Sequence, residues 1–234
     1  MGDRSFRCVM KTVIGTAFVI VTGLCPYAAM ARAPYYVDDA GITDTGKIQS
    51  ANWLSHSNKG DNFGAAGVAF QIVSNFETTL QTTRELGNGD SETSLTLQGK
   101  YLWRDASAPS TWANSVAAGT TYDVQGGAIS GAYAYIPVTF GITPAISMNG
   151  DMGWQYTRPD SRNFLMWGLN ASMRATDAVS FTGEIFGKDT GRAGQQAGVS
   201  WQAPDQVIAI DLVYGHDIDG TDGNWVTTGI TLLF

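Results

Sequence analysis

The feature that most constrains the fold is an alternation of apolar and polar residues with a period of two, which recurs from residue 47 to the end of the chain. Successive side chains of a β-strand point to opposite faces, so this period indicates strands and not helices. Residues typical of turns divide the alternation into twelve segments: 47–57, 63–72, 75–85, 93–104, 111–123, 132–141, 145–157, 163–175, 179–187, 194–202, 206–215 and 224–234. The sequence therefore predicts an all-β protein with an even number of strands.

The composition of the two faces indicates which kind of β protein this is. In the segment 145–157, the residues Ile146, Met148, Met152 and Trp154 share one face, whereas the other face is polar with little charge. Only 15% of the chain is charged, and the outer face of a soluble sandwich would be richly charged. Aromatic residues collect near segment ends on the apolar face: Trp103, Trp112, Tyr122, Trp154, Tyr156, Trp201 and Tyr214. An apolar outer band with aromatic girdles predicts a closed antiparallel transmembrane β-barrel of about 12 strands, because a barrel without edges satisfies its backbone in lipid.

The start of the chain predicts an export signal. Basic residues precede a 13-residue apolar core (13–25), and Ala29-Met30-Ala31 forms a small-x-small cleavage site. A membrane-spanning helix needs about 20 apolar residues, so this core is too short for an anchor. Both cysteines of the chain precede residue 26, as expected for an exported protein without disulfides. The predicted organisation is a signal peptide (1–31), a periplasmic N-terminal segment (32–46) and an outer-membrane β-barrel (47–234). Whether the segment 32–46 plugs the barrel stays open.

The connections and the last segment indicate a location. If the first strand runs outward, the connections on the periplasmic side are mostly short, such as 73–74 and 142–144, and the outer ones are longer, such as 86–92. Short inner turns and long outer loops are typical of outer-membrane barrels. The last segment alternates up to a terminal Phe234, which resembles the strand that the barrel-assembly machinery reads. The sequence thus predicts the outer membrane of a Gram-negative bacterium, with its lipid and its assembly machinery as partners.

Six segments also carry a family resemblance: 34–41 (PYYVDDAG), 46–49 (GKIQ), 100–103 (KYLW), 183–187 (GEIFG), 211–215 (DLVYG) and 225–229 (WVTTG). In this order they resemble an outer-membrane family named for transport in the MetA pathway of phenol degradation. The resemblance covers most of the chain after the signal. It implies an outer-membrane barrel that passes small solutes, including hydrophobic or aromatic compounds.

Charged residues on the polar face are the candidates for lining a lumen, because a lumen accepts charges that lipid rejects. They are Glu77, Lys100, Arg104, Asp151, Arg174, Glu184, Lys188 and Asp211. Two pairs, Glu77 with Lys100 and Arg174 with Glu184, are expected on neighbouring strands. Two interpretations stay open, either salt bridges that fill a narrow barrel or a lining that selects solutes by charge. Under the second, the cations Lys100, Arg174 and Lys188 shape which solutes pass.

Other chemistry has little support. The net charge of −7 leaves no basic patch for nucleic acid. Neither His56 nor His216 has a carboxylate or amide partner at a fixed spacing, so no enzyme and no catalytic residue is predicted. The acidic loop 216–224 and the pair Asp38-Asp39 offer oxygen ligands for Ca²⁺, but a solvated loop and a polar segment at the periplasmic rim are the simpler interpretations. No metal or cofactor is predicted.

Two functions from different classes remain. The first is passive transport of a small solute through the barrel. The second is a non-conducting structural or interaction barrel. Twelve strands lie between the eight that side chains fill and the 16–18 that leave a water channel, so strand number alone does not separate the two.

Overall fold

The computed structural model describes residues 34–60, 62–86, 92–106, 111–158, 161–190, 193–218 and 223–234. Twelve strands make up the regular structure of these residues: β1 (Ile48–Ser57), β2 (Asn62–Val73), β3 (Phe76–Glu85), β4 (Thr93–Arg104), β5 (Trp112–Asp123), β6 (Ala128–Thr143), β7 (Ile146–Thr157), β8 (Arg162–Arg174), β9 (Val179–Lys188), β10 (Ala193–Gln202), β11 (Ile208–Asp217) and β12 (Asn224–Leu233). Within the described residues, no helix has the length and hydropathy to cross a membrane. The predicted signal peptide, 1–31, lies outside the described residues.

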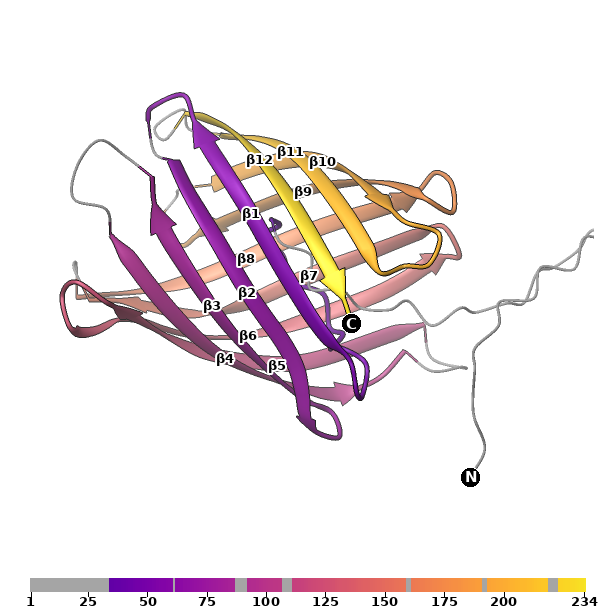
Figure 1. Cartoon of the computed structure of the whole chain (residues 1–234), viewed down its shortest axis with the longest axis horizontal. Helices are drawn as coiled ribbons and strands as arrows, with labels where there is room; N and C mark the ends of the chain where they lie inside the picture. Colours follow the sequence, from indigo (N-terminus) through magenta and orange to yellow (C-terminus); the bar gives the residue numbers. More distant parts are fainter. Residues whose placement is uncertain are drawn as a thin grey trace, which may run out of the picture.

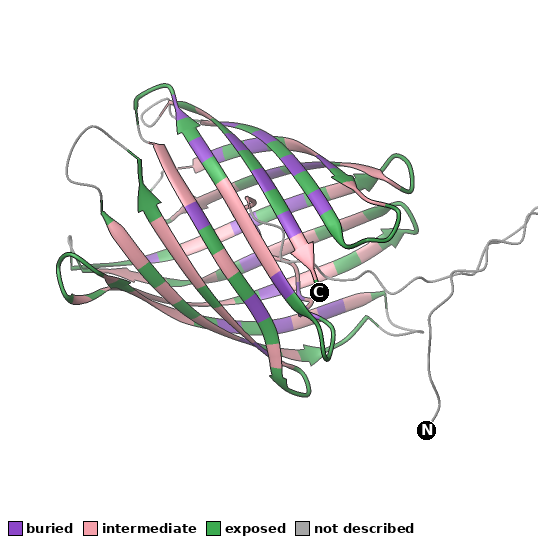
Figure 2. Cartoon of the chain, viewed as in Figure 1, coloured by how far each residue is buried: buried purple, intermediate pink, exposed green. Residues whose placement is uncertain are grey.

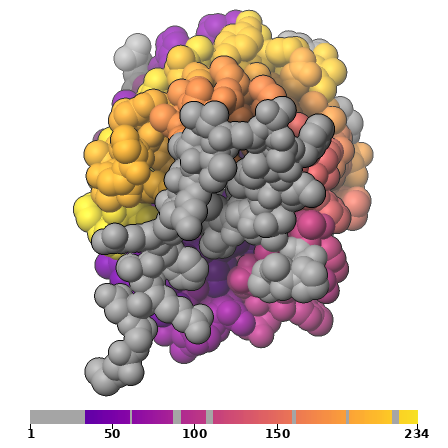
Figure 3. Space-filling view, turned by 90° about the vertical axis from the view of Figure 1, so that its right-hand side faces the viewer, coloured from indigo at the N-terminus to yellow at the C-terminus, as the bar shows by residue number. Residues whose placement is uncertain are grey.

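The strands form one closed barrel in which each strand pairs antiparallel with its neighbours in the chain (Figure 1). The first and last strands close the ring, with Gln49 opposite Leu233 and Ser57 opposite Trp225. Just beyond this register, Ile48 and Phe234 exchange two backbone hydrogen bonds of 2.9 and 3.1 Å. Viewed from one end, the yellow C-terminal strand lies beside the indigo N-terminal strands (Figure 3). The predicted twelve-stranded antiparallel barrel is confirmed.

The alternation in the sequence becomes an alternation between the two faces of the wall (Figure 2). On β11, Asp211 and Val213 are buried on the inner face, whereas Ile210, Leu212 and Tyr214 are exposed on the outer face. The outer face carries most of the large apolar side chains, so water would be a poor solvent for it. A lipid bilayer is the environment in which this face is stable, and a closed ring leaves no strand edge unpaired there.

The largest departure from the predicted strands is at β6, which begins at Ala128 and not at residue 132. The glycine-rich residues 124–131 predict a loop, but the structure places the turn at 124–127 and continues the pairing beyond it. A β-bulge after Thr121 keeps Tyr122 opposite Ile129 and Asp123 opposite Ala128. Bulges allow one extra residue in a strand without ending the ladder, and the apolar–polar pattern alone does not reveal them.

Candidate functional site

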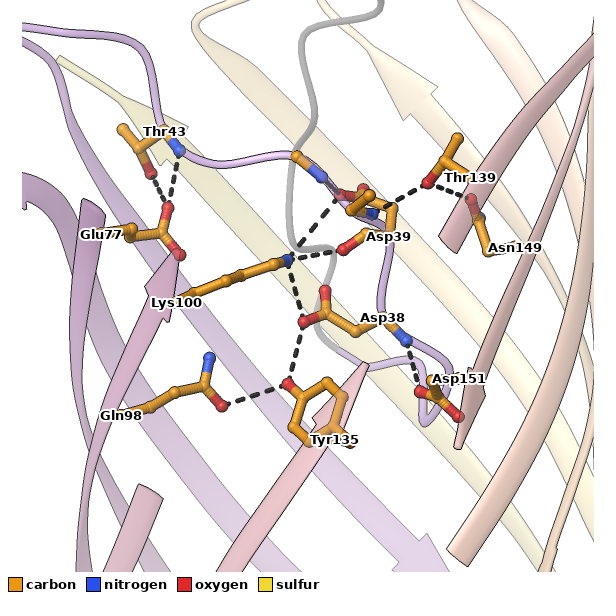
Figure 4. A network of polar contacts seen from close by, with 12 residues as sticks. Asp38, Asp39, Thr43, Glu77, Gln98, Lys100, Tyr135, Thr139, Asn149 and Asp151 are labelled. Carbon is orange, nitrogen blue, oxygen red and sulfur yellow. Dashed lines mark hydrogen bonds and ion pairs between the residues drawn. The ribbon is translucent and has the colours of Figure 1, made fainter. Parts of the chain in front are cut away.

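The N-terminal segment lies inside the barrel. We call residues 34–43 the plug. Its residues Val37, Ala40, Ile42 and Thr43 are all less than 9% exposed, because side chains of the inner wall surround them. At one end of the plug, Thr43 contacts Glu77 on β3 (Figure 4). From there the plug runs towards the wall formed by β9 and β10. Within the predicted N-terminal segment 32–46, residues 34–43 therefore lie in the lumen of the barrel.

One end of the plug is anchored on Glu184 of β9. The backbone N–H groups of Tyr36 and Val37 donate to the two carboxylate oxygens of Glu184 at 2.7 and 3.2 Å. The same carboxylate accepts hydrogen bonds from the side-chain amides of Asn170 at 3.2 Å and Gln196 at 2.7 Å. Glu184 is 4% exposed, so this carboxylate is buried but fully supplied with donors. A buried carboxylate is tolerated when hydrogen bonds replace its lost hydration.

The other backbone contacts of the plug follow the same pattern. The N–H of Asp38 donates to Asp151 of β7 at 3.1 Å, and both the N–H and the hydroxyl of Thr43 donate to Glu77 of β3, at 2.6 and 2.7 Å. Between them, the N–H of Ala40 donates to the hydroxyl of Thr139 at 2.8 Å. Hydrogen bonds to charged acceptors contribute more than neutral ones, so these contacts hold the plug main chain along its length.

A buried ion pair lies at the centre of the plug. Lys100 is fully buried, and its Nζ donates to the carboxylate of Asp38 at 2.9 Å and to the backbone carbonyl of Asp39 at 2.6 Å. The hydroxyl of Tyr135 donates to the same Asp38 oxygen at 2.9 Å (Figure 4). The predicted neighbours Glu77 and Lys100 do stand directly opposite each other on β3 and β4. Nevertheless, the closest carboxylate to Lys100 comes from the plug and not from the wall.

The wall also accommodates the side chains of the plug. A Cβ atom added to Gly168 would lie 2.5 Å from Cγ2 of Val37, and one added to Gly198 would lie 2.4 Å from the hydroxyl of Tyr35. Side chains at either position would therefore collide with the plug. The ring of Tyr36 stacks on Phe186 with a centroid distance of 4.0 Å. Its other neighbour, the ring of Trp225 at 6.5 Å, meets it edge-on. The lumen surface is shaped to this segment.

Of the eight lumen candidates, five are buried on the inner face: Glu77, Lys100, Asp151, Glu184 and Asp211. The first four contact or surround the plug. Asp211 of β11 instead accepts a hydrogen bond from Ser200 on the neighbouring strand. The sequence thus predicted most of the charged groups of the site.

The other three candidates lie at strand ends, outside this network. A bulge between Leu102 and Arg104 shifts the alternation by one residue, and the guanidinium of Arg104 lies 4.1 Å from the centroid of the Trp112 ring, at the outer face. Arg174 is exposed and donates to the carbonyl of Pro144 in the turn between β6 and β7. Lys188 ends β9, with its Nζ 4.8 Å from the centroid of the Phe164 ring. Arg104 therefore lies off the inner face, whereas Arg174 and Lys188 end their strands at the rims of the barrel.

The predicted neighbours Arg174 and Glu184 are not opposite each other. Asn170 stands opposite Glu184, and Arg174 stands opposite Ser180. Pattern reasoning missed the plug contacts because most of them come from backbone N–H groups, which every residue carries. The apolar residues Val37, Ala40 and Ile42 on either side of the Asp38-Asp39 pair are a sequence signal that this segment is buried.

Each histidine has a side-chain amide partner, contrary to the interpretation of the sequence, and in both cases the partner lies on a neighbouring strand. His56 contacts the amide oxygen of Asn62 at 2.6 Å, and His216 contacts the side chain of Gln195 at 2.6 Å. Part of the acidic loop, 219–222, lies outside the described residues. Among the residues the structure does describe, no three metal-ligating side chains form a group.

The fold defines the class as a closed twelve-stranded antiparallel barrel, and it is similar to the folds of solved outer-membrane porins and channels. The solved structure titled "KdgM porin" superposes with a TM-score of 0.64 at 8% identity, covering 79% of this chain and 98% of that one. The NanC porin gives 0.61 at 7% identity, covering 79% and 98%. The COG4313 outer membrane channel from Pseudomonas putida F1 gives 0.57 at 10% identity, covering 82% and 96%.

The chain belongs to the family described as "Uncharacterised conserved protein UCP029691", whose model matches residues 19–234. No curated protein matches it. The family description names no substrate, so the resemblance to the MetA-pathway family is not confirmed.

Proposed function

We propose that this protein is an outer-membrane channel that passes small solutes, and that the plug closes its lumen when no solute is moving. The carrying observation is the polar, charged inner wall of a closed barrel, filled across its centre by a segment of the same chain. A barrel that served only as a scaffold would be more stable with an apolar interior, because buried charges cost free energy even when paired. The likeness in fold to porins and channels supports the same conclusion.

The residues of the lumen bear on the chemical identity of the solute. The resemblance to the MetA-pathway family favours small hydrophobic or aromatic compounds, and the ring cluster of Tyr36, Phe186 and Trp225 is compatible with an aromatic group. The inner wall around the plug, however, carries three carboxylates and one ammonium group. Such a lining favours solutes with polar and charged groups, as charge rings do in other pores.

A reversible covalent lock tests the channel directly. The Cβ of Val37 lies 3.5 Å from the position of a Cβ on residue 168, within the range that a disulfide requires. We expect vesicles containing the oxidised double variant Val37→Cys/Gly168→Cys to swell in small solutes no faster than protein-free vesicles. A thiol reductant should restore the swelling rate several-fold, because the plug can then leave.

The single variant Val37→Cys is the matched control, since it cannot form the lock and should swell equally with and without reductant. If neither the native protein nor the reduced double variant passes any solute, although both are folded by circular dichroism, the barrel is a non-conducting one. That outcome would favour the structural alternative over the channel.

Assembly provides a separate prediction. We propose that the strand ending at Phe234 is the signal that the barrel-assembly machinery recognises. Deleting Phe234 also removes the two backbone hydrogen bonds to Ile48 at the barrel closure. We expect the truncated protein to be exported but to reach the outer membrane at less than about a tenth of the normal amount, as measured by cell fractionation. Replacement by tyrosine, which keeps the backbone and the ring, is the control and should assemble normally.

A further inference from the structure

We infer that the inner wall beneath the plug is a binding site for short peptides, and that the plug, residues 34–43, is its built-in occupant. The use of such a site in transport rests on the proposed channel function, but binding itself does not. Its ligand is defined by the chemistry that the wall offers to the plug.

Recognition is directed mainly at the main chain. Five backbone N–H groups of the plug donate to acceptors on four wall side chains, Glu184, Asp151, Thr139 and Glu77. Three of these acceptors are carboxylates, which bind N–H donors more strongly than neutral groups do. Since every polypeptide carries the same donors, this part of the site does not depend on the sequence of the plug.

The site also holds a complementary cation. Lys100 donates both to the backbone carbonyl of Asp39 and to the carboxylate of Asp38. A ligand must therefore present N–H donors to the carboxylates and carbonyl or carboxylate acceptors to the ammonium group. A simple amine satisfies only the first requirement, and a phenol, with one O–H donor and one weak acceptor oxygen, satisfies each requirement only in part. A peptide with an acidic residue satisfies both.

The side-chain contacts of the plug indicate which residue types the site prefers at successive positions of a ligand. The ring of Tyr36 lies against Phe186 and Trp225, and Val37 fills the space left by Gly168. The carboxylate of the next residue, Asp38, reaches Lys100. The wall thus fits an aromatic residue, a small branched residue and an acidic residue in succession.

The wall has acceptor capacity that the plug leaves unused. Glu77 is 2% exposed, and among the described residues its Oε1 has no hydrogen-bond partner, although Oε2 accepts two bonds from Thr43. A buried acceptor without a donor costs free energy, so a ligand with one more donor would bind there more strongly than the plug does. The plug would leave most readily in exchange for such a ligand, because an empty site would leave buried charges unpaired.

Binding is testable with a full-length variant that releases the plug but leaves the wall intact. Asp38→Lys/Asp39→Lys places two cations beside buried Lys100 and should expel the plug. A fluorescent decapeptide with the native sequence of residues 34–43 is the probe. We expect it to bind this variant in detergent at least tenfold more tightly than it binds the native protein, where the tethered plug competes at a high effective concentration. If the charge-reversed variant does not fold, Tyr36→Gly/Val37→Gly loosens the plug without new charges and serves in its place.

Three comparisons decide whether the wall recognises a main chain. Adding Glu184→Ala to the variant should weaken peptide binding at least tenfold, and Glu184→Gln should weaken it less, because its amide oxygen still accepts. A probe methylated on the nitrogens that match Tyr36 and Val37 should bind at least tenfold more weakly. Equal binding of the methylated and unmethylated probes would overturn the proposal.

Competition identifies the solute class. The tripeptide Tyr-Val-Asp should displace the probe, whereas phenol at the same concentration should not. Displacement by phenol but not by the tripeptide would overturn the peptide assignment in favour of aromatic compounds. Because anisotropy of the probe reports occupancy without transport, peptide binding by a barrel that fails the swelling assay would refute the channel and keep the site. Swelling without peptide binding would refute the peptide site and leave the channel proposal intact.

Discussion

Replacing Gly168 by valine is expected to open the lumen. A Cβ at this position lies 2.5 Å from Cγ2 of Val37 and 2.9 Å from the carboxylate of Asp151, so the valine side chain and the docked plug cannot share the space. Overpacking of this kind costs about 1–3 kcal/mol. The contact with Val37 exists only in the docked state, whereas Asp151 belongs to the wall in both states, so only the cost that arises at Val37 favours release. The released state should become about tenfold more populated. Planar bilayers should show a time-averaged conductance about tenfold above that of the native protein.

Two further variants make this result specific. Gly183→Val adds the same side chain to the neighbouring strand, where a Cβ meets nothing within 4 Å, and should leave the conductance unchanged. Val37→Ala combined with Gly168→Val returns the lost space and should close the channel again, at least in part. If Gly168→Val alone opens the lumen and the combination does not reclose it, the contact between these two residues is not what seats the plug.

The barrel could be predicted from the sequence because its determinants are local. Every strand repeats the same alternation, and one slip of register would turn a whole apolar face inward, so the pattern specifies pairing as well as strand position. The end of β4 and the start of β6 are two exceptions. At both places a bulge changes the count by one residue, which moved Arg104 off the inner face and extended β6 through a glycine-rich stretch.

The plug could not be predicted in the same way. Its partners are far away in the chain, as with Tyr36 and Glu184, and its donors are backbone N–H groups that leave no signature in residue types. The wall residues were visible as inward charges, but their sequence suggested pairing within the wall. Lys100 and Glu77 stand side by side on neighbouring strands. Only the three-dimensional structure shows that each makes its shortest side-chain hydrogen bonds with the plug. The role of Gly168 likewise could not be predicted, because only its short distance to Val37 distinguishes it from the other glycines.

The second large effect concerns the outer wall. Leu169 lies near the middle of β8, is 52% exposed and faces outward, whereas Ser172 on the same strand faces inward and contacts the hydroxyl of Thr182 at 2.9 Å. If the outer face lies in lipid, Leu169→Arg places a charge in hydrocarbon and should lower the free energy of unfolding by about 2–4 kcal/mol. Ser172→Arg points its charge into the polar lumen and should cost much less. Reversible unfolding by denaturant in lipid vesicles measures both.

Leu169→Ala is the control that separates charge from lost contact, since it removes the same side chain without adding an ion. It should cost clearly less than Leu169→Arg, because a truncated side chain at a lipid-facing position leaves space that acyl chains can fill. Equal losses for Leu169→Arg and Ser172→Arg would contradict a lipid-facing outer wall. The same refolded variants also connect stability to function, because Ser172→Arg adds a cation to the inner wall close to Asn170 and should not prevent the plug from seating on Glu184.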